Sequence, residues 1–237
     1  MNPDSFRRWA AEAIGTFCLV FAGTGAIVVN DFSEGAITHL GISATFGLIV
    51  FAMIYTFGPI SGSHLNPAVT LGLWLCKRMK ASDVTPYIIA QCVGALLASM
   101  TLRGMFADHA TLGATLPTGG IWRAFGFEVF LTGLLMLVIL NTTNPHHPAK
   151  DYAGFVIGAV VGLEALFGGP ISGASMNPAR SLGPALVSGA IADLWIYWTA
   201  PWLGILAAVS MHRLLMFSTT EDRESQVEHT TIEPEHK

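Results

Sequence analysis

A 15-residue stretch of this chain occurs twice, and the two copies lie 111 residues apart. The first copy covers residues 58–72 and the second covers residues 169–183, and 10 of the 15 aligned positions are identical. A repeat of this quality within one chain indicates an internal duplication. The chain is therefore expected to fold as two similar halves, each organised around its own copy.

Each copy has the residue pattern of a helix start. An Asn is followed by a Pro in both: Asn is favoured at the N-cap, and Pro is tolerated at the first helical position. The helices predicted from these starts are Asn66–Cys76 and Asn177–Val187, about 10 residues or about 15 Å each, which is half of a hydrocarbon core of about 30 Å. The Gly-Pro-x-Ser-Gly run before each Asn is expected to stop the preceding helix, so loops are predicted over Gly58–Leu65 and Gly168–Met176.

The rest of the chain has the composition of a membrane protein. Hydrophobic residues make up 52% and charged residues only 12%, whereas soluble domains carry about 25% charged residues. Uncharged stretches such as 40–76, 84–102 and 194–212 exceed the roughly 18 residues that suggest a membrane span. The predicted spans are Trp9–Val29, Ile37–Phe57, Val84–Leu102, Trp122–Asn141, Tyr152–Phe167 and Leu194–Phe217. The fold class is thus an all-α membrane protein of six transmembrane helices and two re-entrant half-helices.

The number of spans fixes the relation between the halves. Three spans per half is an odd number, so the halves face opposite ways and the two half-helices enter from opposite sides and meet. We expect one domain over residues 1–217, with repeats at about 6–103 and 121–217 and a disordered, acidic cytoplasmic tail over 218–237. Nine of the 12 Lys and Arg residues fall on the side of both termini, which predicts that both ends are cytoplasmic.

The meeting point of the half-helices is the candidate site. Two helix N-termini direct their positive dipole ends and two carboxamides toward one place. A passing water could accept hydrogen bonds from both Asn side chains, while a cation would meet dipole ends of its own sign. The competing interpretation, two ordinary N-caps in a soluble protein, fits the apolar surroundings poorly. The residues of the two boxes are Asn66, Pro67, Ala68, Asn177, Pro178 and Ala179.

Four charged residues fall in apolar segments, where a charge is costly and usually functional or paired. Glu12 and Glu128 occupy equivalent places near the start of a first span, and we predict that each binds backbone N–H groups of a re-entrant loop; a proton relay is the alternative. Arg180 lies in the first turn of a half-helix, where the dipole disfavours it, and is predicted to contact solutes and repel cations unless it forms a structural salt bridge. Glu164 is expected to bind loop backbone, with a neighbouring subunit or the pore border as alternatives.

These features together resemble the major intrinsic protein family, the aquaporins and aquaglyceroporins, over about residues 6–216. The resemblance rests on the two Asn-Pro-Ala boxes with Arg180, Glu12 and Glu128. It implies a pore in every subunit, a homotetramer and a place in the plasma or inner cell membrane. No catalytic residue, metal site, cofactor or nucleic-acid partner is indicated.

The resemblance also places a narrow selectivity filter on Phe46, Ala165, Ala174 and Arg180. Strict water channels of the family usually carry His at the position of Ala165, so this filter should be wider and less polar than a water-only filter.

Other markers of the family favour a water channel over a glycerol channel. Glycerol channels tend to carry Asp and a basic residue where this chain has Ser181 and Ala185, and they lack the aromatic pair Tyr197-Trp198. The segment 163–170, in contrast, resembles bacterial and plant-like members linked to metalloid hydroxides.

The expected function is a passive channel for water and small uncharged solutes, with glycerol or metalloid hydroxides such as arsenite as candidates, that excludes ions and protons. A strict water channel and a junction or adhesion protein on the same scaffold remain alternatives. A membrane-embedded enzyme is the third, and it lacks a clustered nucleophile and base in the sequence.

Overall fold

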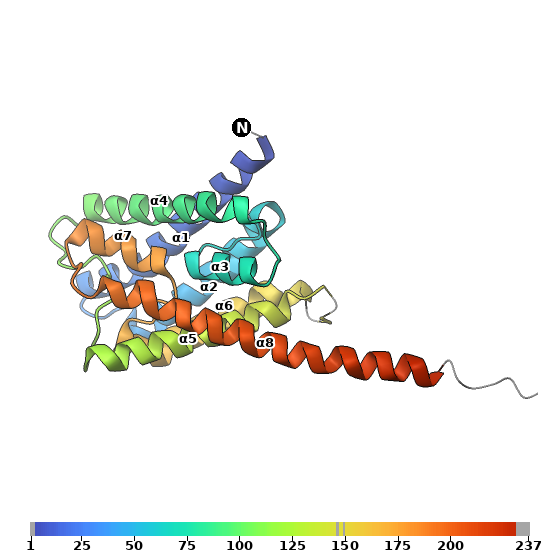
Figure 1. The fold of residues 1–237 in the computed structure, drawn as a ribbon. Helices are drawn as coiled ribbons and strands as arrows, with labels where there is room; N and C mark the ends of the chain where they lie inside the picture. Colours follow the sequence, from blue (N-terminus) through green and yellow to red (C-terminus); the bar gives the residue numbers. More distant parts are fainter. Residues whose placement is uncertain (1–2, 146, 149, 231–237) are drawn as a thin grey trace, which may run out of the picture.

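A computed structural model describes residues 3–145, 147–148 and 150–230, and this part of the chain is built of helices and their connections (Figure 1). Six of its helices are long and apolar enough to cross a membrane, so the chain is a multi-pass membrane protein and the predicted fold class is confirmed. These helices are α1 (Pro3–Phe32), α2 (Thr38–Ser61), α4 (Ala81–Met105), α5 (Ile121–Thr142), α6 (Ala153–Ser172) and α8 (Leu194–Thr230). A 3-10 turn at Lys150–Tyr152 precedes α6.

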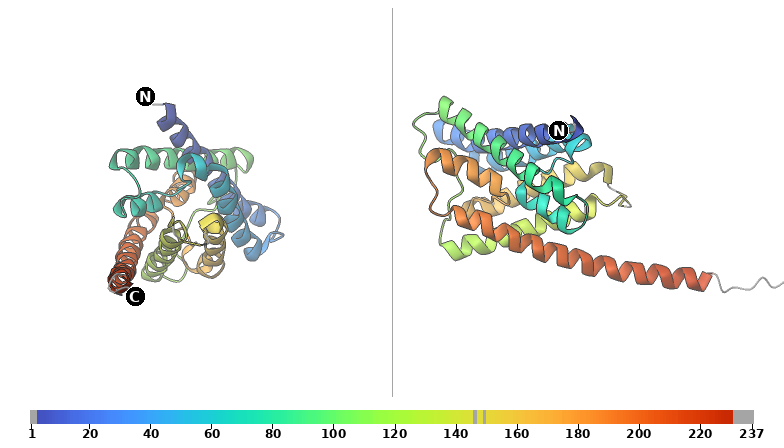
Figure 2. Two further views of the ribbon diagram at one scale, coloured as in Figure 1. Left: turned by 90° about the vertical axis from the view of Figure 1, so that its right-hand side faces the viewer. Right: turned by 45° about the horizontal axis from the view of Figure 1, so that its top comes forward.

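Two short helices complete the fold, α3 (Pro67–Leu75) and α7 (Pro178–Ser188). Each half thus repeats one order, with α1 to α4 matched by α5 to α8. Helix α1 packs on α4 as α5 packs on α8, while α2 packs on α6 across the two halves. Helices α3 and α7 contact each other in the middle of the bundle, and Figure 2 shows the long helices around them from two further directions.

The ends of α2 and α6 differ from the prediction. The Gly-Pro-x-Ser run does not stop either helix: α2 continues through Pro59 to Ser61, and α6 continues in the same way through its own Pro. A helical Pro loses one backbone hydrogen bond, which membrane helices tolerate. The stop comes at the next Gly: Gly62 and Gly173 are left-handed, with φ of 89° and 83°, and each N–H donates to the carbonyl four residues earlier at 2.9 Å. Only five residues separate each span from its half-helix, not the eight or nine predicted.

The halves approach closely where small residues face each other. A Cβ at Gly47 of α2 would lie 2.7 Å from the carbonyl oxygen of Gly158 of α6, so the two backbones are nearly in contact there. Close helix approach at small residues is typical of packing in lipid. The α2–α6 contact therefore helps to hold the two halves, and with them the two half-helices, against one another.

The C-terminal end differs from the expected disordered tail over 218–237. Helix α8 continues to Thr230 and extends past the ends of the other helices (Figures 1 and 2). The remainder of that predicted tail, residues 231–237, lies outside the described residues.

Candidate functional site

The two Asn-Pro-Ala boxes form the N-termini of α3 and α7, as predicted. Asn66 has an extended backbone, and its Oδ1 accepts from the Ala68 N–H at 2.8 Å. Asn177 caps α7 in the same way and accepts from the N–H groups of Ala179 and Arg180 at 3.0 and 3.2 Å. The oxygen of each carboxamide is thus occupied in holding its own helix start.

The amide nitrogens of the same two side chains link the halves. Asn66 Nδ2 donates to the Met176 carbonyl at 2.8 Å, and Asn177 Nδ2 donates to the Leu65 carbonyl at 2.8 Å. Leu65 and Met176 precede the two Asn residues, and both have a left-handed φ of 54°. Such a conformation costs a non-glycine residue on the order of 1–3 kcal/mol. Here it accompanies a carbonyl that is bonded across the junction.

Each carboxamide has two N–H donors, so this crossed arrangement uses one and leaves one. Both Asn side chains are nearly buried, with exposed fractions of 4% and 5%, and both line one cavity of about 320 Å³. The sequence predicted a solute that faces both carboxamides, and the cavity provides the space for that contact.

Glu12 binds the first re-entrant segment. Its Oε1 accepts from the Ser61 hydroxyl at 2.7 Å and the His64 N–H at 2.9 Å. Its Oε2 accepts from the Leu65 N–H and from Gln91 Nε2, both at 2.8 Å. The carboxylate is fully buried, and it satisfies two backbone donors that the segment cannot pair within a helix.

Glu128 repeats this arrangement in the second half. It accepts from the Ser172 hydroxyl at 2.7 Å, the Ser175 N–H at 2.9 Å and the Met176 N–H at 2.8 Å. The partners are the residues that the 111-residue repeat places opposite those of Glu12. The predicted contact of both Glu residues with loop N–H groups is therefore present in each half.

Sequence reasoning missed several members of these two networks. The Ser61 and Ser172 hydroxyls, at the ends of α2 and α6, donate to Glu12 and Glu128. The repeated Ser of the Gly-Pro-x-Ser-Gly run could have indicated these contacts. Tyr87 and Tyr197 donate to the carbonyls of these same two serines, at 2.8 and 2.6 Å. Gln91 joins only the first network, so the two halves are alike but not identical.

The four predicted filter residues all lie on the wall of the cavity that also holds the two Asn side chains. The Arg180 Cζ atom stands 5.0 Å from the centre of the Phe46 ring, a cation–π distance. Ala165 and Ala174 are small and line the same cavity. The structure thus brings Phe46, Arg180 and the two Ala residues together around one space.

Arg180 is held by a connection that the sequence did not point to. Its Nη1 donates to the Gly113 carbonyl, in the segment between α4 and α5, at 2.8 Å. The predicted alternative of a structural salt bridge is wrong within the described residues, where no carboxylate lies within 4.0 Å of it. An Arg side chain has five N–H donors, and Nε has no partner in the described chain.

Glu164 does not bind loop backbone, so that prediction is wrong. Its side chain is fully buried, and neither carboxylate oxygen has a hydrogen-bond partner among the described residues. It does not line the cavity either, although the next residue, Ala165, does. Successive residues of a helix point in different directions, so Glu164 faces the helix bundle instead.

The electrostatics of the cavity are one-sided. Among the described residues that line it, Arg180 is the only one with a permanent charge, and no Asp or Glu contributes. Most of the remaining wall is aliphatic, with Leu19, Val50, Val161 and Leu135 among its members. The described residues contain no group of His, Cys, Asp and Glu that could hold a metal ion. The arrangement suits passage of a neutral solute and offers no stabilising partner to a cation.

Comparison with known proteins agrees with this geometry. Residues 1–212 match the family model described as major intrinsic protein. The chain is 40% identical to Nodulin-26 of Glycine max over 213 residues, covering 90% of this chain and 79% of the relative. It is 40% identical to Aquaporin NIP1-2 of rice, Oryza sativa subsp. japonica, over 216 residues, covering 88% of this chain and 71% of the relative.

A solved structure is similar as well. The X-ray structure of the aquaglyceroporin from Plasmodium falciparum superposes with a TM-score of 0.79 at 25% sequence identity, covering 88% of this chain and 95% of that one. Sequence and fold thus give the same result over nearly the whole of the described chain.

Proposed function

Since the chain belongs to the major intrinsic protein family and is a channel for water and small solutes, we propose that its pore is the cavity between the two Asn-Pro-Ala boxes. The observation that carries the proposal is that one cavity is lined by Asn66, Asn177 and all four filter residues. We take residues 1–217 as one channel domain made of two repeats, with Glu12 and Glu128 as the scaffold of its two re-entrant segments. No catalytic role is assigned to any residue.

Exclusion of ions follows from the charges around this pore. The N-termini of α3 and α7 both carry a partial positive charge, and Arg180 adds a full one at the cavity wall. Fixed positive ends and an Arg repel cations and protons in pores of this type. An anion would lose its hydration in a largely aliphatic passage, so neutral solutes are favoured.

The substrate class follows from the filter. Arg180 presents hydrogen-bond donors, the Phe46 ring presents an apolar face, and two Ala residues leave space beside them. Such a constriction fits a solute with hydroxyls on one side and a nonpolar side opposite, such as glycerol or an arsenite-like hydroxide, and it admits water. A strict water channel is the alternative, and Ser181 and Tyr197 are the positions that favour it by family pattern.

The setting in the cell is proposed from the same features. Large hydrophobic side chains are exposed on the outer faces of the spans, Leu48, Val93 and Phe155 among them, which suits contact with lipid and with other subunits of a homotetramer. The excess of Lys and Arg at one end supports the proposal that both termini are cytoplasmic, and we propose the plasma or inner membrane as the location. Lys77→Cys and Thr111→Cys, in a chain with Cys76→Ser, should react with a membrane-impermeant maleimide from opposite sides of the membrane.

The functional test is stopped-flow light scattering on proteoliposomes. Water, glycerol, urea and arsenite are compared under matched osmotic gradients, with empty liposomes as the baseline. We expect accelerated flux of water and of at least one larger neutral solute, and no ionic current in planar bilayers. Acceleration of water alone would favour the strict water channel, and no acceleration of any solute would overturn the proposal.

A further inference from the structure

The two halves are related about a line that passes between Gly47 and Gly158. These glycines are partners under the 111-residue offset. A Cβ at Gly47 would lie 2.7 Å from the Gly158 carbonyl oxygen, and a Cβ at Gly158 would lie 2.6 Å from the Gly47 oxygen. Asn66 and Asn177 are partners too, and their side chains bond reciprocally across the junction. Because these contacts are reciprocal, each residue of one half has a counterpart across this line in the other.

The four filter residues therefore have counterparts on the opposite side of the two boxes. The counterparts of Phe46, Ala165, Ala174 and Arg180, in that order, are Ile157, Ile54, Ser63 and Val69. All four line the same cavity as the filter, and we call them the counterpart set. The cavity thus passes one set on each side of the boxes.

The counterpart set lacks the hydrogen-bond donors of the filter. Val69 stands where the filter has its guanidinium, and Ile54 adds bulk where the filter has a small Ala. A Cβ at Gly154 of α6 would lie 2.9 Å from Ile54 Cγ2, so this side chain packs between α2 and α6. The Ser63 hydroxyl donates to the Met53 carbonyl at 3.0 Å, so its hydrogen is already used. The set therefore presents a mainly aliphatic surface to a solute.

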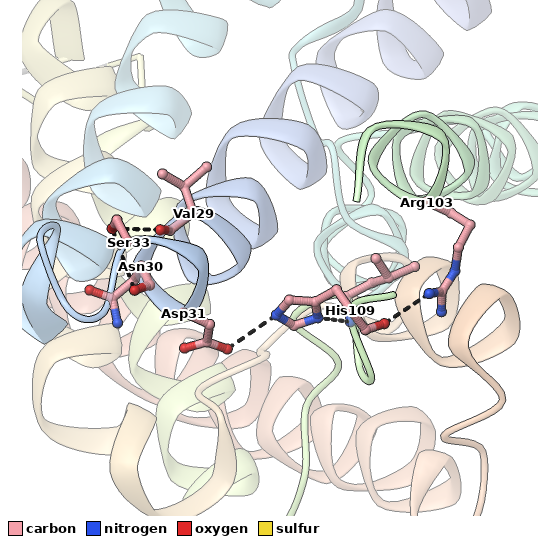
Figure 3. Close-up of polar contacts among 7 residues, drawn as sticks. Val29, Asn30, Asp31, Ser33, Arg103 and His109 are labelled. Carbon is pink, nitrogen blue, oxygen red and sulfur yellow. Dashed lines mark hydrogen bonds and ion pairs between the residues drawn. The ribbon is translucent and has the colours of Figure 1, made fainter. Parts of the chain in front are cut away.

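The filter side also has a support that the counterpart set lacks. The connection over residues 106–120 is tied to its neighbours at His109, whose Nε2 lies 3.1 Å from Asp31 Oδ2 and whose carbonyl accepts from Arg103 Nη1 at 2.8 Å (Figure 3). This connection supplies the Gly113 carbonyl that holds the filter guanidinium. The equivalent place in the second half follows α8, which continues as a helix. The packing of helices alone thus determines the space within the counterpart set.

We propose that the counterpart set forms a second constriction, which selects solutes by dehydration. A hydrophobic constriction removes water from whatever enters it, and an apolar wall returns no hydrogen bond for the hydration that is lost. The filter instead offers the donors of Arg180. The two constrictions in series favour a solute that has hydroxyls and also apolar surface, and they disfavour one that is polar on every side, such as urea. The inference rests on the proposed function, because it requires permeation, and adds a second selective site to it.

Val69→Thr tests dehydration at nearly constant width, because Thr and Val have similar volumes and Thr adds a hydroxyl. The measurement is the ratio of urea to glycerol permeability in proteoliposomes, by stopped-flow light scattering, and this ratio cancels the amount of folded protein. One net hydrogen bond changes an equilibrium by roughly two- to tenfold, and we expect the ratio to rise by that factor. The matched control is Val160→Thr, because Val160 is buried on α6 and does not line the cavity. It should leave the ratio unchanged.

Ile157→Ala tests the width of the second constriction. Removing most of this side chain should raise the permeability of both urea and glycerol relative to that of water. The matched control is Ile49→Ala, which removes the same side chain from α2 at a position that does not line the cavity. Ala153, one turn nearer the start of α6, lies outside the set, because its repeat partner Ile42 does not line the cavity.

The results distinguish this inference from the proposed function. An unchanged urea-to-glycerol ratio in folded, conducting Val69→Thr overturns the inference, and so does an equal rise in Val160→Thr. Unchanged solute-to-water ratios in folded Ile157→Ala overturn it as well, and this variant decides if Val69→Thr does not fold. If the unmodified protein passes water alone, water permeability per folded channel must rise in Val69→Thr above that in Val160→Thr, or the inference fails. If the unmodified protein accelerates no solute and no water, the proposed function fails instead.

Discussion

The side chain of Asn66, in the first half, donates a hydrogen bond of 2.8 Å to the carbonyl of Met176, in the second half. The reverse contact, from Asn177 to Leu65, has the same length. Each box therefore helps to hold the backbone of the other half as well as its own helix. A side chain that lines the pore is at the same time a joint between the two repeats, so a change there should affect permeation and assembly together.

Replacing Asn66 or Asn177 by Asp tests both roles. Asp accepts the N-cap hydrogen bond as Asn does but has no N–H to donate, so one carbonyl loses its partner at a cost of about 1–3 kcal/mol. The carboxylate also adds a negative charge where two positive helix ends meet. We expect a lower midpoint of thermal unfolding and a measurable cation current in bilayers.

The control for these variants is Asn141→Asp. Asn141 Nδ2 donates to the Leu137 carbonyl within α5 at 2.7 Å, and the residue does not line the cavity. The Asn141→Asp variant should therefore still exclude cations. Folded box variants that conduct water and still exclude cations would contradict the role of the two helix ends in cation exclusion.

Replacing Glu12 or Glu128 by Ala should destabilise the protein. Four donors lose their acceptor in the first case and three in the second. Each buried donor left without a partner costs on the order of 1–3 kcal/mol. We expect poor yield from detergent and a large fall in the thermal midpoint for both variants. Gln at either position keeps one acceptor oxygen and should be intermediate, and normal stability of both Ala variants would argue for another role.

Replacing Glu164, unlike Glu12 or Glu128, should not destabilise the protein. The repeat places it at the position of Met53 in the first half, and its carboxylate has no partner in the described chain. Burying a carboxyl group without a hydrogen-bond partner costs free energy, which an apolar side chain of similar volume does not. Glu164→Met should therefore keep or raise the midpoint of thermal unfolding, measured beside Glu128→Met, which should lower it.

A loss of stability in Glu164→Met would carry its own meaning. Because Glu164 is fully buried and the described chain offers it no partner, such a loss would contradict the prediction and would point to a buried water that stabilises the carboxyl.

The sequence predicted the parts of the site that are written as local patterns. Asn66-Pro67 marks a helix start wherever it occurs, and an odd number of spans between two such starts brings them together. Glu12 stood out because a charge in a span needs a partner. These predictions rest on capping, hydropathy and the cost of burial, which depend on nearby residues alone.

The parts that were missed depend on tertiary contacts. Pro59 predicted the end of a helix, but the helix continued because the left-handed turn came three residues later, at Gly62. No pattern in the sequence connects Gly113 with Arg180, since their contact depends on how one long connection folds over the second half. Glu164 is predicted to bind loop backbone because a charge in a span is usually paired, but in the structure it is buried in the bundle without a partner among the described residues.

The last prediction concerns the width of the filter. Ala165 lies on the cavity wall with Phe46 and Arg180, and replacing it by His adds bulk and a polar group beside the guanidinium. Ala165→His should lower glycerol permeability more than water permeability, because the added ring takes up the space that the larger solute needs. For comparison, one methylene in a hydrophobic pocket changes discrimination by roughly 10–200-fold. The matched control is Ala153→His, which adds the same side chain to the same cavity at the start of α6, about 18 Å farther along the helix. The measurement is the ratio of glycerol to water permeability of both variants by stopped-flow light scattering, and only Ala165→His should lower it. If both variants change the ratio equally, or if neither does while both conduct water, selectivity is not set at Ala165.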